Sequence, residues 1–161
     1  YAIIISPEKQ ELYLVKDYKI QKVYLVSTSK YGLGTRLNSN KTPYGTHRVI
    51  AKIGQDAPFG TIFNSRVNTG RIASINSETF QKTQKDYVTT RILWLDGQEK
   101  GVNKGGLNDS YGRCIYIHGT PEEKWIGYPT SKGCIRMNNK DVVELFELVG
   151  TGVLVEIIPK S

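Results

Sequence analysis

The sequence contains few of the side chains that bind metals or act as nucleophiles. Its 161 residues include only two histidines, two cysteines and one methionine. The cysteines, Cys114 and Cys134, form no Cys-x-x-Cys pair, so we expect no metal site. The glycine-rich stretch 101–106 lacks the Gly-Lys-Ser/Thr ending of a phosphate-binding loop, and we expect no bound cofactor. Any chemistry must therefore rest on very few residues.

Long hydrophobic runs are also missing. No apolar stretch approaches the roughly 20 residues that a membrane-spanning helix needs. The formal net charge is +7, which is compatible with a polyanionic partner. However, the chain has no basic helix, RNP-like run or zinc-finger spacing, so we expect no nucleic-acid partner. We interpret the charge as a basic surface suited to an anionic cell envelope, or as an aid to solubility.

The composition favours sheet and turn over helix, because the chain has 16 glycines and 10 tyrosines. It shows no repeat, linker or low-complexity block, so we expect residues 1–161 to form one mostly-β domain. Alternating or short apolar runs bounded by turn residues predict the following strands: 2–6, 12–15, 19–27, 46–53, 61–63, 88–95, 114–118 and 153–158.

One helix is predicted near the C-terminus. Asn138 or Asn139 is expected to cap its start, and Gly150 to follow its end. Apolar residues recur at the spacing of one buried helical face: Val142, Leu145, Phe146 and Val149.

The stretch 65–87 is polar and has few apolar anchors. It can be a solvated loop. It can equally be an insertion that overhangs a site, since long loops in compact domains often serve as lids. The sequence leaves both interpretations open.

The most informative residues lie between 118 and 137. His118 stands 16 residues before Cys134, and glycines lie beside both, at Gly119 and Gly133. Thiol chemistry needs a sulfur, a base and backbone N–H groups that hold an oxyanion. A glycine before the cysteine lets the backbone approach a substrate carbonyl. We therefore predict that Cys134 is a nucleophile and that His118 takes its proton and lowers its pKa.

This segment resembles the signature of the L,D-transpeptidase family, also called the YkuD or ErfK/YbiS group. The family carries a histidine followed some 15 residues later by a Ser-x-Gly-Cys-x-Arg run, which here is 131–136. The stretches 42–45 (Thr-Pro-Tyr-Gly) and 117–123 also resemble family segments, and the likeness covers nearly all of the chain. Many relatives have a second histidine at the position of Lys132, which weakens any role for that side chain.

The resemblance implies a β-sandwich-like catalytic fold and acyl transfer on peptidoglycan stem peptides. Cys134 would form a thioester with a donor tetrapeptide and release its terminal D-residue. Gly119 would offer its carbonyl to the ring of His118. The protein is then expected in the bacterial cell envelope, periplasmic or otherwise extracytoplasmic. Since the chain begins at Tyr1, any export signal is expected outside it.

Further site residues are assigned around this pair. The N–H groups of Gly133 and Cys134 are expected to stabilise the oxyanion. Arg136 can bind a substrate carboxylate, or it can anchor the cysteine loop to nearby acceptors. The other candidate substrate-binding residues are Ser131, Lys132, Thr120 and Tyr116, although Ser131 can instead shape the turn before Gly133.

The remaining histidine and cysteine are interpreted as structural. His47 lies in a strand-like run. Cys114 lies four strand residues from His118, about 13 Å at ~3.3 Å per residue, so contact between His118 and Cys134 would exclude a Cys114–Cys134 disulfide.

Two other functions stay open. An L,D-carboxypeptidase uses the same His and Cys but resolves the thioester with water, and the sequence does not separate it from a transpeptidase. A non-catalytic peptidoglycan-binding module is a third possibility, against which the intact His118–Cys134 pair argues. The sequence does not indicate an oligomeric state.

Overall fold

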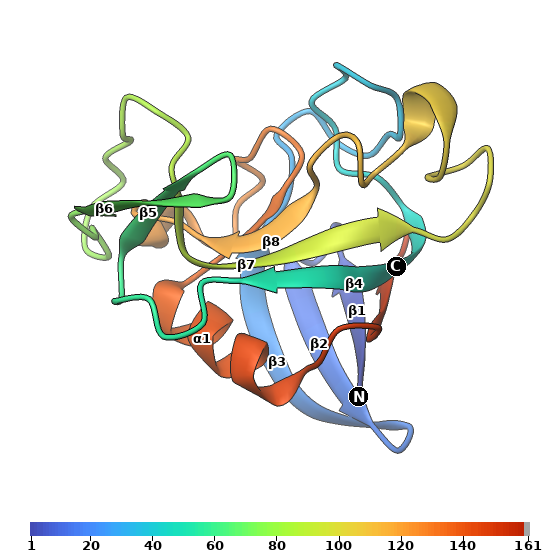
Figure 1. Cartoon of the computed structure of the whole chain (residues 1–161), viewed down its shortest axis with the longest axis horizontal. Helices are drawn as coiled ribbons and strands as arrows, with labels where there is room; N and C mark the ends of the chain where they lie inside the picture. The colour runs from blue at the N-terminus through green and yellow to red at the C-terminus, as the bar shows by residue number, and fades with distance from the viewer. Residues whose placement is uncertain (160–161) are drawn as a thin grey trace.

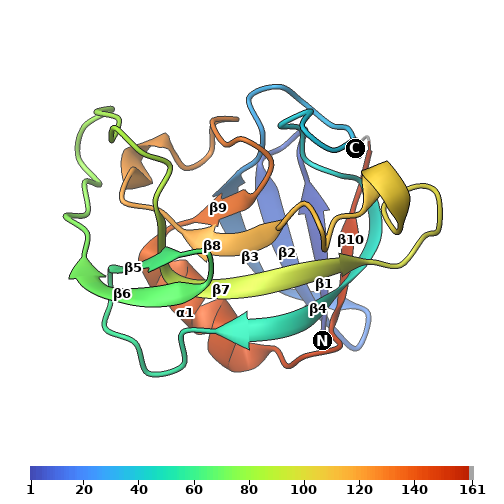
Figure 2. The same cartoon turned by 45° about the horizontal axis from the view of Figure 1, so that its top comes forward.

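The structure is a computed structural model that describes residues 1–159 of the chain. Ten strands form one sheet, and the sheet closes on itself. Eight of them follow the order β4-β10-β1-β2-β3-β9-β8-β7, and β7 pairs again with β4, which completes a barrel-like ring. In Figure 2, β4, β7, β8 and β9 lie in front of β1, β2 and β3.

The strands have the following bounds: β1 (Ala2–Ser6), β2 (Glu11–Lys16), β3 (Lys19–Ser27), β4 (Gly45–Ile53), β5 (Thr61–Asn64), β6 (Val67–Ile72), β7 (Val88–Gly97), β8 (Tyr116–Gly119), β9 (Ile135–Met137) and β10 (Leu154–Ile157). The other regular elements of the described residues are one α-helix, α1 (Asn139–Leu148), and two short 3-10 helices, η1 (Gly106–Asn108) and η2 (Glu123–Trp125). The predicted mostly-β fold with one helix near the C-terminus is confirmed. The single predicted domain, 1–161, extends two residues beyond the described part.

Alternation of side chains places the core inside the ring. Ile3 and Ile5 of β1, and Leu12 and Leu14 of β2, are fully buried, whereas their neighbours along each strand are more exposed. In β3 the buried apolar residues are Tyr24 and Val26, and the apolar Ile20, Val23 and Leu25 face outward.

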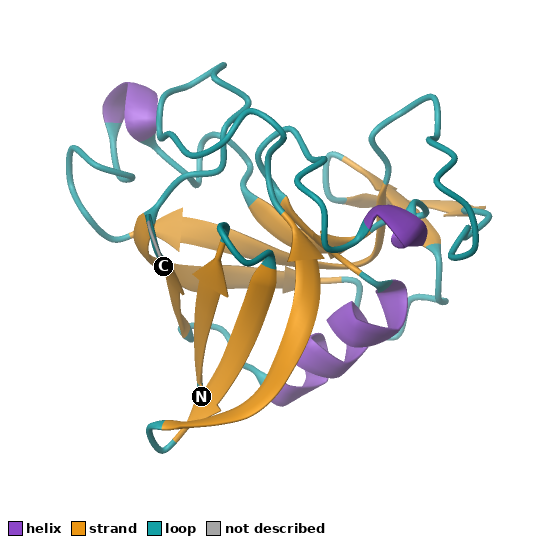
Figure 3. Ribbon diagram, turned by 180° about the vertical axis from the view of Figure 1, so that it is seen from behind, coloured by secondary structure: helices purple, strands orange, loops and turns teal. Residues whose placement is uncertain are grey.

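Helix α1 packs against β7 and β8 and contributes to the same core. Figure 3 shows it beside the strands at one end of the ring. The predicted stripe of Val142, Leu145, Phe146 and Val149 is confirmed, since all four are at most 2% exposed. Val149 is the C-cap residue, so Gly150 follows the helix as predicted.

The predicted N-cap is wrong in its chemistry. Asn138 occupies the cap position, but its side chain makes no capping hydrogen bond. The carboxylate of Glu123 instead accepts the N–H of Asn139 at 2.8 Å. The amide of Asn139 is buried and joins the helix start to the hydroxyl of Thr89 (2.6 Å) and the carbonyl of Thr120 (2.8 Å).

Two strands escape the sequence analysis. β9 has only three residues, too few to show a period. β6 is mostly exposed at the outer edge of the sheet, so it has no apolar face to alternate with a polar one. It pairs with β5, and the β5–β6 hairpin extends from β7 outside the ring (Figure 1).

The segment 65–87 is therefore part strand and part loop. After β6 it runs over residues 73–87 and binds the 121–128 segment. The N–H of Asn76 donates to the carbonyl of Pro121 (2.8 Å), and the indole of Trp125 donates to the carbonyl of Phe80 (2.8 Å). Phe80 also packs edge-on against Trp125, with ring centroids 4.9 Å apart. The 73–87 loop is therefore tethered rather than freely solvated, and its action as a lid stays a prediction.

Within residues 1–159, no helix has the length and apolar character needed to cross a membrane.

Candidate active site

The parallel pairing of β8 with β9 determines which side chains meet. Ile117 lies opposite Ile135 and His118 opposite Arg136. Both isoleucines are fully buried in the main core, so their neighbours along the strands point to the opposite face. His118 and Arg136 lie on that face. Tyr116 and Cys134, each two residues earlier in the chain, lie on it as well.

The thiol of Cys134 is held by backbone groups of the preceding strand. Its Sγ donates to the carbonyl of Cys114 and accepts from the N–H of Tyr116, both at 3.3 Å. Burial raises the pKa of the thiol to about 12, and the Tyr116 N–H offsets only part of this effect. The sulfur is therefore a protonated thiol at rest. Burial is the dominant influence on this pKa, and the expected lowering by His118 stays a prediction.

The register also corrects the distance argument about Cys114. Cys134 lies beside Tyr116 rather than beside His118, so the carbonyl of Cys114 contacts its sulfur. The 13 Å that separates Cys114 from His118 therefore does not apply to Cys134, and the transfer of that distance to Cys134 is wrong. Both cysteines are nevertheless free thiols.

His118 is prepared to act as a base. Its side chain is 1% exposed, and its Nδ1 lies 2.6 Å from the carbonyl of Gly119. Because a carbonyl only accepts, Nδ1 carries the proton and Nε2 holds the free lone pair. Burial lowers the pKa of the imidazole, which is neutral near pH 7. The contact that the resemblance implied for Gly119 is thus present.

His118 and Cys134 are diagonal neighbours on this face. A strand spacing near 4.8 Å and two residues of rise place their Cα atoms about 8 Å apart. At that separation, long side chains on one face of a sheet can meet. A neutral imidazole and a thiol therefore lie on the same face of the sheet.

The loop before Cys134 is fixed by internal hydrogen bonds. Ser131 is buried; its hydroxyl donates to the carbonyl of Cys134 (2.6 Å) and accepts the N–H of Gly133 (3.2 Å). Gly133 has φ +129°, and a Cβ there would lie 3.3 Å from the carbonyl of Lys41, so glycine is required. These contacts support the turn-shaping alternative for Ser131. The N–H of Gly133 is engaged, and the oxyanion role of the Cys134 N–H stays a prediction.

Arg136 has two carboxylate partners within the protein. The residue is 5% exposed. Its Nη1 lies 3.3 Å from Glu122 Oε1, and its Nη2 pairs with Asp86. Among the described residues, only its Nε is a buried polar atom without a hydrogen bond. The anchoring alternative is the one that the contacts support: Arg136 joins β9 to the 73–87 loop and to the segment after β8.

Arg136→Ala is expected to lower the free energy of unfolding by about 3–5 kcal/mol, because it leaves Glu122 buried without its counter-charge. Arg71 on β6 is an exposed arginine, and Arg71→Ala is the matched control, with an expected change within about 0.5 kcal/mol. Urea unfolding of both variants measures the difference. A loss below about 1 kcal/mol for Arg136→Ala would contradict the anchoring role.

The other predicted residues have mixed positions. Thr120 is buried, and its hydroxyl accepts the N–H of Glu122 at 3.2 Å, so it is structural. Lys132 is exposed beside the cysteine loop. The phenol of Tyr116 accepts a hydrogen bond from Arg66 (2.8 Å). His47 is fully buried between the carbonyl of Gly45 and the hydroxyl of Ser110, as a structural residue.

Sequence reasoning missed Arg66, Asp86 and Glu122. None of them belongs to the motif, and each reaches this face from a different connecting segment. No sequence signal marks them, because their positions depend on how the connections fold over β8 and β9.

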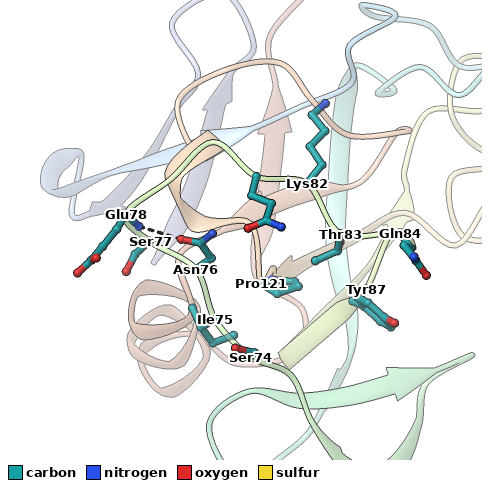
Figure 4. Close-up of a pocket in the computed structure, with 11 residues that line it drawn as sticks. Ser74, Ile75, Asn76, Ser77, Glu78, Lys82, Thr83, Gln84, Tyr87 and Pro121 are labelled. Carbon is teal, nitrogen blue, oxygen red and sulfur yellow. Dashed lines mark hydrogen bonds between the residues drawn. The ribbon is translucent and has the colours of Figure 1, made fainter.

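A cavity of about 660 Å³ lies beside the site, between the 74–87 loop and Pro121 (Figure 4). Its lining is mostly neutral and polar, and includes Asn76, Thr83 and Tyr87. Neither His118 nor Cys134 lines it, so the cavity is separate from the reactive pair.

Comparison with known proteins gives a consistent result. A family model described as the L,D-transpeptidase catalytic domain matches residues 1–157. The putative L,D-transpeptidase YqjB of Bacillus subtilis is 28% identical over 155 residues, which are 95% of this chain and 69% of that protein. The probable L,D-transpeptidase ErfK/SrfK of Salmonella typhimurium is 44% identical over 126 residues, 73% of this chain and 40% of that protein.

Solved structures share the fold. L,D-transpeptidase 3 from Mycobacterium tuberculosis aligns with a TM-score of 0.59 at 14% identity, over 98% of this chain and 60% of that one. LdtMt1 in complex with imipenem aligns with a TM-score of 0.57 at 16% identity, over 98% of this chain and 58% of that one. The chain thus spans about three-fifths of each of these structures. At such low identity the likeness establishes the fold alone.

Proposed function

The chain belongs to the L,D-transpeptidase catalytic domain family, and on that premise we propose that it transfers acyl groups between peptidoglycan stem peptides through a thioester on Cys134. The observation that carries the proposal is the shared face of His118 and Cys134, with Nδ1 of the imidazole bound to Gly119 and Nε2 left as the base. A binding module without catalysis would have no need of this pair.

The first step acylates the enzyme. As the sulfur of Cys134 attacks the donor carbonyl, its S–H proton passes to Nε2 of His118. A C–S bond forms, and the N–H of Cys134 stabilises the oxyanion. The C–N bond to the terminal D-residue then breaks. The leaving amine takes the proton from His118 and departs as a free amino acid, which leaves a thioester and a neutral imidazole.

The second step transfers the acyl group. An acceptor amine attacks the thioester carbonyl and gives one proton to His118. The C–S bond breaks as the new amide forms, and His118 returns the proton to the sulfur. With water as the acceptor the same sequence gives a carboxylic acid, which is the carboxypeptidase outcome. We place this chemistry outside the cytoplasm, where peptidoglycan lies.

The protonated thiol suits this mechanism. Burial keeps both the thiol and the imidazole neutral at rest, so no charge has to be held in an apolar place before substrate binds. Charge then develops only during attack, when the oxyanion and the imidazolium form together. General-base catalysis contributes about 10²–10⁴-fold in such reactions.

Incubation with a disaccharide-tetrapeptide is expected to give cross-linked dimer, detected by mass spectrometry together with the released D-residue. Tripeptide as the main product would assign the protein as a carboxypeptidase. An intact protein that gives neither product would contradict the proposal.

An independent test uses β-lactams. Two solved L,D-transpeptidases of the same fold, LdtMt1 and L,D-transpeptidase 3 from Mycobacterium tuberculosis, were determined with imipenem and with a faropenem-derived adduct, respectively. If the proposed chemistry holds here, imipenem is expected to add its mass to this protein once, on the tryptic peptide that contains Cys134. Addition at another residue would contradict the assignment of the nucleophile.

A further inference from the structure

Three arginines lie near Cys134 or near its neighbours Cys114 and Tyr116, and they differ in what they bind. Arg136 is buried between Asp86 and Glu122. Arg113 donates to the carbonyls of Lys41 and Gly34, and its guanidinium closes the loop before Cys134. Both guanidinium groups are bound within the protein, and among the described residues only Nε of Arg136 is a buried polar atom without a hydrogen bond. Arg66 is different.

One edge of the Arg66 guanidinium is held by contacts within the protein, and its other donors make no hydrogen bond in the described part of the chain. It follows Ser65 in the β5–β6 turn, where both residues have positive φ (+47° and +69°). Its Nη1 donates to the phenol of Tyr116 at 2.8 Å and lies 3.7 Å from the sulfur of Cys114. Its guanidinium lies 4.3 Å from the ring centroid of Trp94. These contacts fix the direction of the charged group.

The support under Arg66 is itself rigid. Trp94 stacks on Tyr111 with centroids 4.3 Å apart and 5° between the ring planes, and it meets the ring of Tyr116 edge-on at 5.7 Å. Within residues 1–159, no carboxylate pairs with Arg66, and its Nε and Nη2 make no hydrogen bond. An arginine stacked on an aromatic ring, with a free donor edge and no counter-charge, is suited to bind a carboxylate from outside the protein.

The position of Arg66 relates it to the nucleophile. Its two polar contacts are with Cys114 and Tyr116, whose backbone carbonyl and N–H both contact the sulfur of Cys134 at 3.3 Å. When that sulfur attacks a peptide carbonyl, the carboxylate of a single residue beyond it lies within about 5 Å of the attacked carbon. A donor that ends one residue after the attacked bond would carry its terminal carboxylate into this region.

We propose that Arg66 binds the terminal carboxylate of the donor peptide and so selects donors that end one residue beyond the attacked carbonyl. This inference rests on the proposed function. It assigns to Arg66 the carboxylate recognition that the motif suggested for Arg136. It also gives a role to a charged side chain at the β5–β6 turn, beside the mostly exposed strand β6.

The decisive comparison tests two donors on three variants. The donors are a tetrapeptide with a free terminal carboxylate and the same peptide with a terminal amide. Arg66→Gln is expected to lower kcat/KM for the acid by about 10- to 100-fold and to leave the amide nearly unchanged, which removes the preference for the acid. Arg66→Lys should retain part of the preference. Arg71→Gln, at an exposed arginine of the neighbouring strand, should retain all of it.

A second measurement does not depend on transpeptidation. Iodoacetate carries a carboxylate and iodoacetamide does not, so the ratio of their rates at Cys134 reports the positive charge beside the sulfur. Arg66→Gln is expected to lower this ratio by about 3- to 10-fold, followed by mass spectrometry on the peptide that contains Cys134. Arg71→Gln should leave it unchanged.

The outcomes separate the two proposals. If the wild-type protein turns over neither donor but the alkylation ratio falls in Arg66→Gln, the proposed function fails while the anion site beside Cys134 stands. If the wild-type protein is active and Arg66→Gln lowers both donors equally, or changes neither donor nor the alkylation ratio, the role of Arg66 is overturned.

Discussion

Cys134→Ala is expected to lower kcat/KM for a tetrapeptide donor by about 10⁴-fold or more, whereas Cys114→Ala should stay within about tenfold of the wild type. The two cysteines pack against the same small apolar cluster, but only Cys134 follows Gly133 in the motif that predicts the nucleophile. Cys114 contacts the nucleophile through its backbone carbonyl, which alanine retains. Turnover of a tetrapeptide by each purified variant measures the difference.

The control for Cys134→Ala is its fold. Cys134 is half-buried and packs with the small cluster of Phe63, Ile92 and Tyr116, so alanine leaves a modest cavity and costs about 1–2 kcal/mol. A thermal unfolding curve close to that of the wild type shows that the loss of activity is chemical. Comparable loss of activity in Cys114→Ala would remove the assignment of Cys134 as the only nucleophile.

Much of the fold could be predicted because its signals are local. In β2 the buried Leu12 and Leu14 alternate with more exposed residues, and in α1 the apolar residues recur every three or four positions. Each pattern follows from burying one face. The helix cap could not be predicted in the same way. The carboxylate that caps α1 belongs to Glu123, which lies 16 residues before the amide it accepts.

The reactive pair could be predicted because His118 and Cys134 belong to one continuous motif. Their surroundings could not. Whether Arg136 meets a substrate or an internal carboxylate depends on Asp86, which reaches it from the far end of the 73–87 loop. Arg66 reaches the site through a hairpin whose outer strand has almost no sequence signal. The same limit applies to Cys114: the sequence predicts that Cys134 lies beside His118, whereas it lies beside Tyr116 and so closer to Cys114. That position depends on the β8–β9 pairing, and β9 is too short to predict.

The β8–β9 register buries the sulfur of Cys134, and this burial affects how we expect the thiol to be activated. A cysteine beside a charged histidine would have a lowered pKa. Here the sulfur hydrogen-bonds to the carbonyl of Cys114 and lies in an apolar cluster, so its pKa is raised to about 12. The neutral pair therefore requires proton transfer during attack, and this requirement gives a distinct pH dependence.

His118→Ala is expected to lower kcat/KM by about 10²- to 10⁴-fold at pH 7.5, because the sulfur then loses the base that removes its proton. In the wild type, burial lowers the pKa of His118 below its usual 6.5. Activity should therefore rise with pH through that lowered value, as the imidazole becomes neutral, and then stay level up to about pH 9. Rates of tetrapeptide turnover from pH 5 to 9 measure this profile.

Alkylation of the free protein distinguishes this mechanism from a preformed ion pair. With a thiol pKa of about 12, the iodoacetamide rate at Cys134 should rise about tenfold per pH unit between pH 7 and 10, because the reactive thiolate fraction rises by that factor. His118→Ala should show the same slope, since the resting thiol hydrogen-bonds to Cys114 instead.

A preformed ion pair of Cys134 and His118 would behave otherwise. Its alkylation would level off below pH 8, and its turnover would fall between pH 7 and 9 as the imidazolium loses its proton. Either result would show that His118 ionises the sulfur before substrate arrives, and the neutral pair would have to be abandoned.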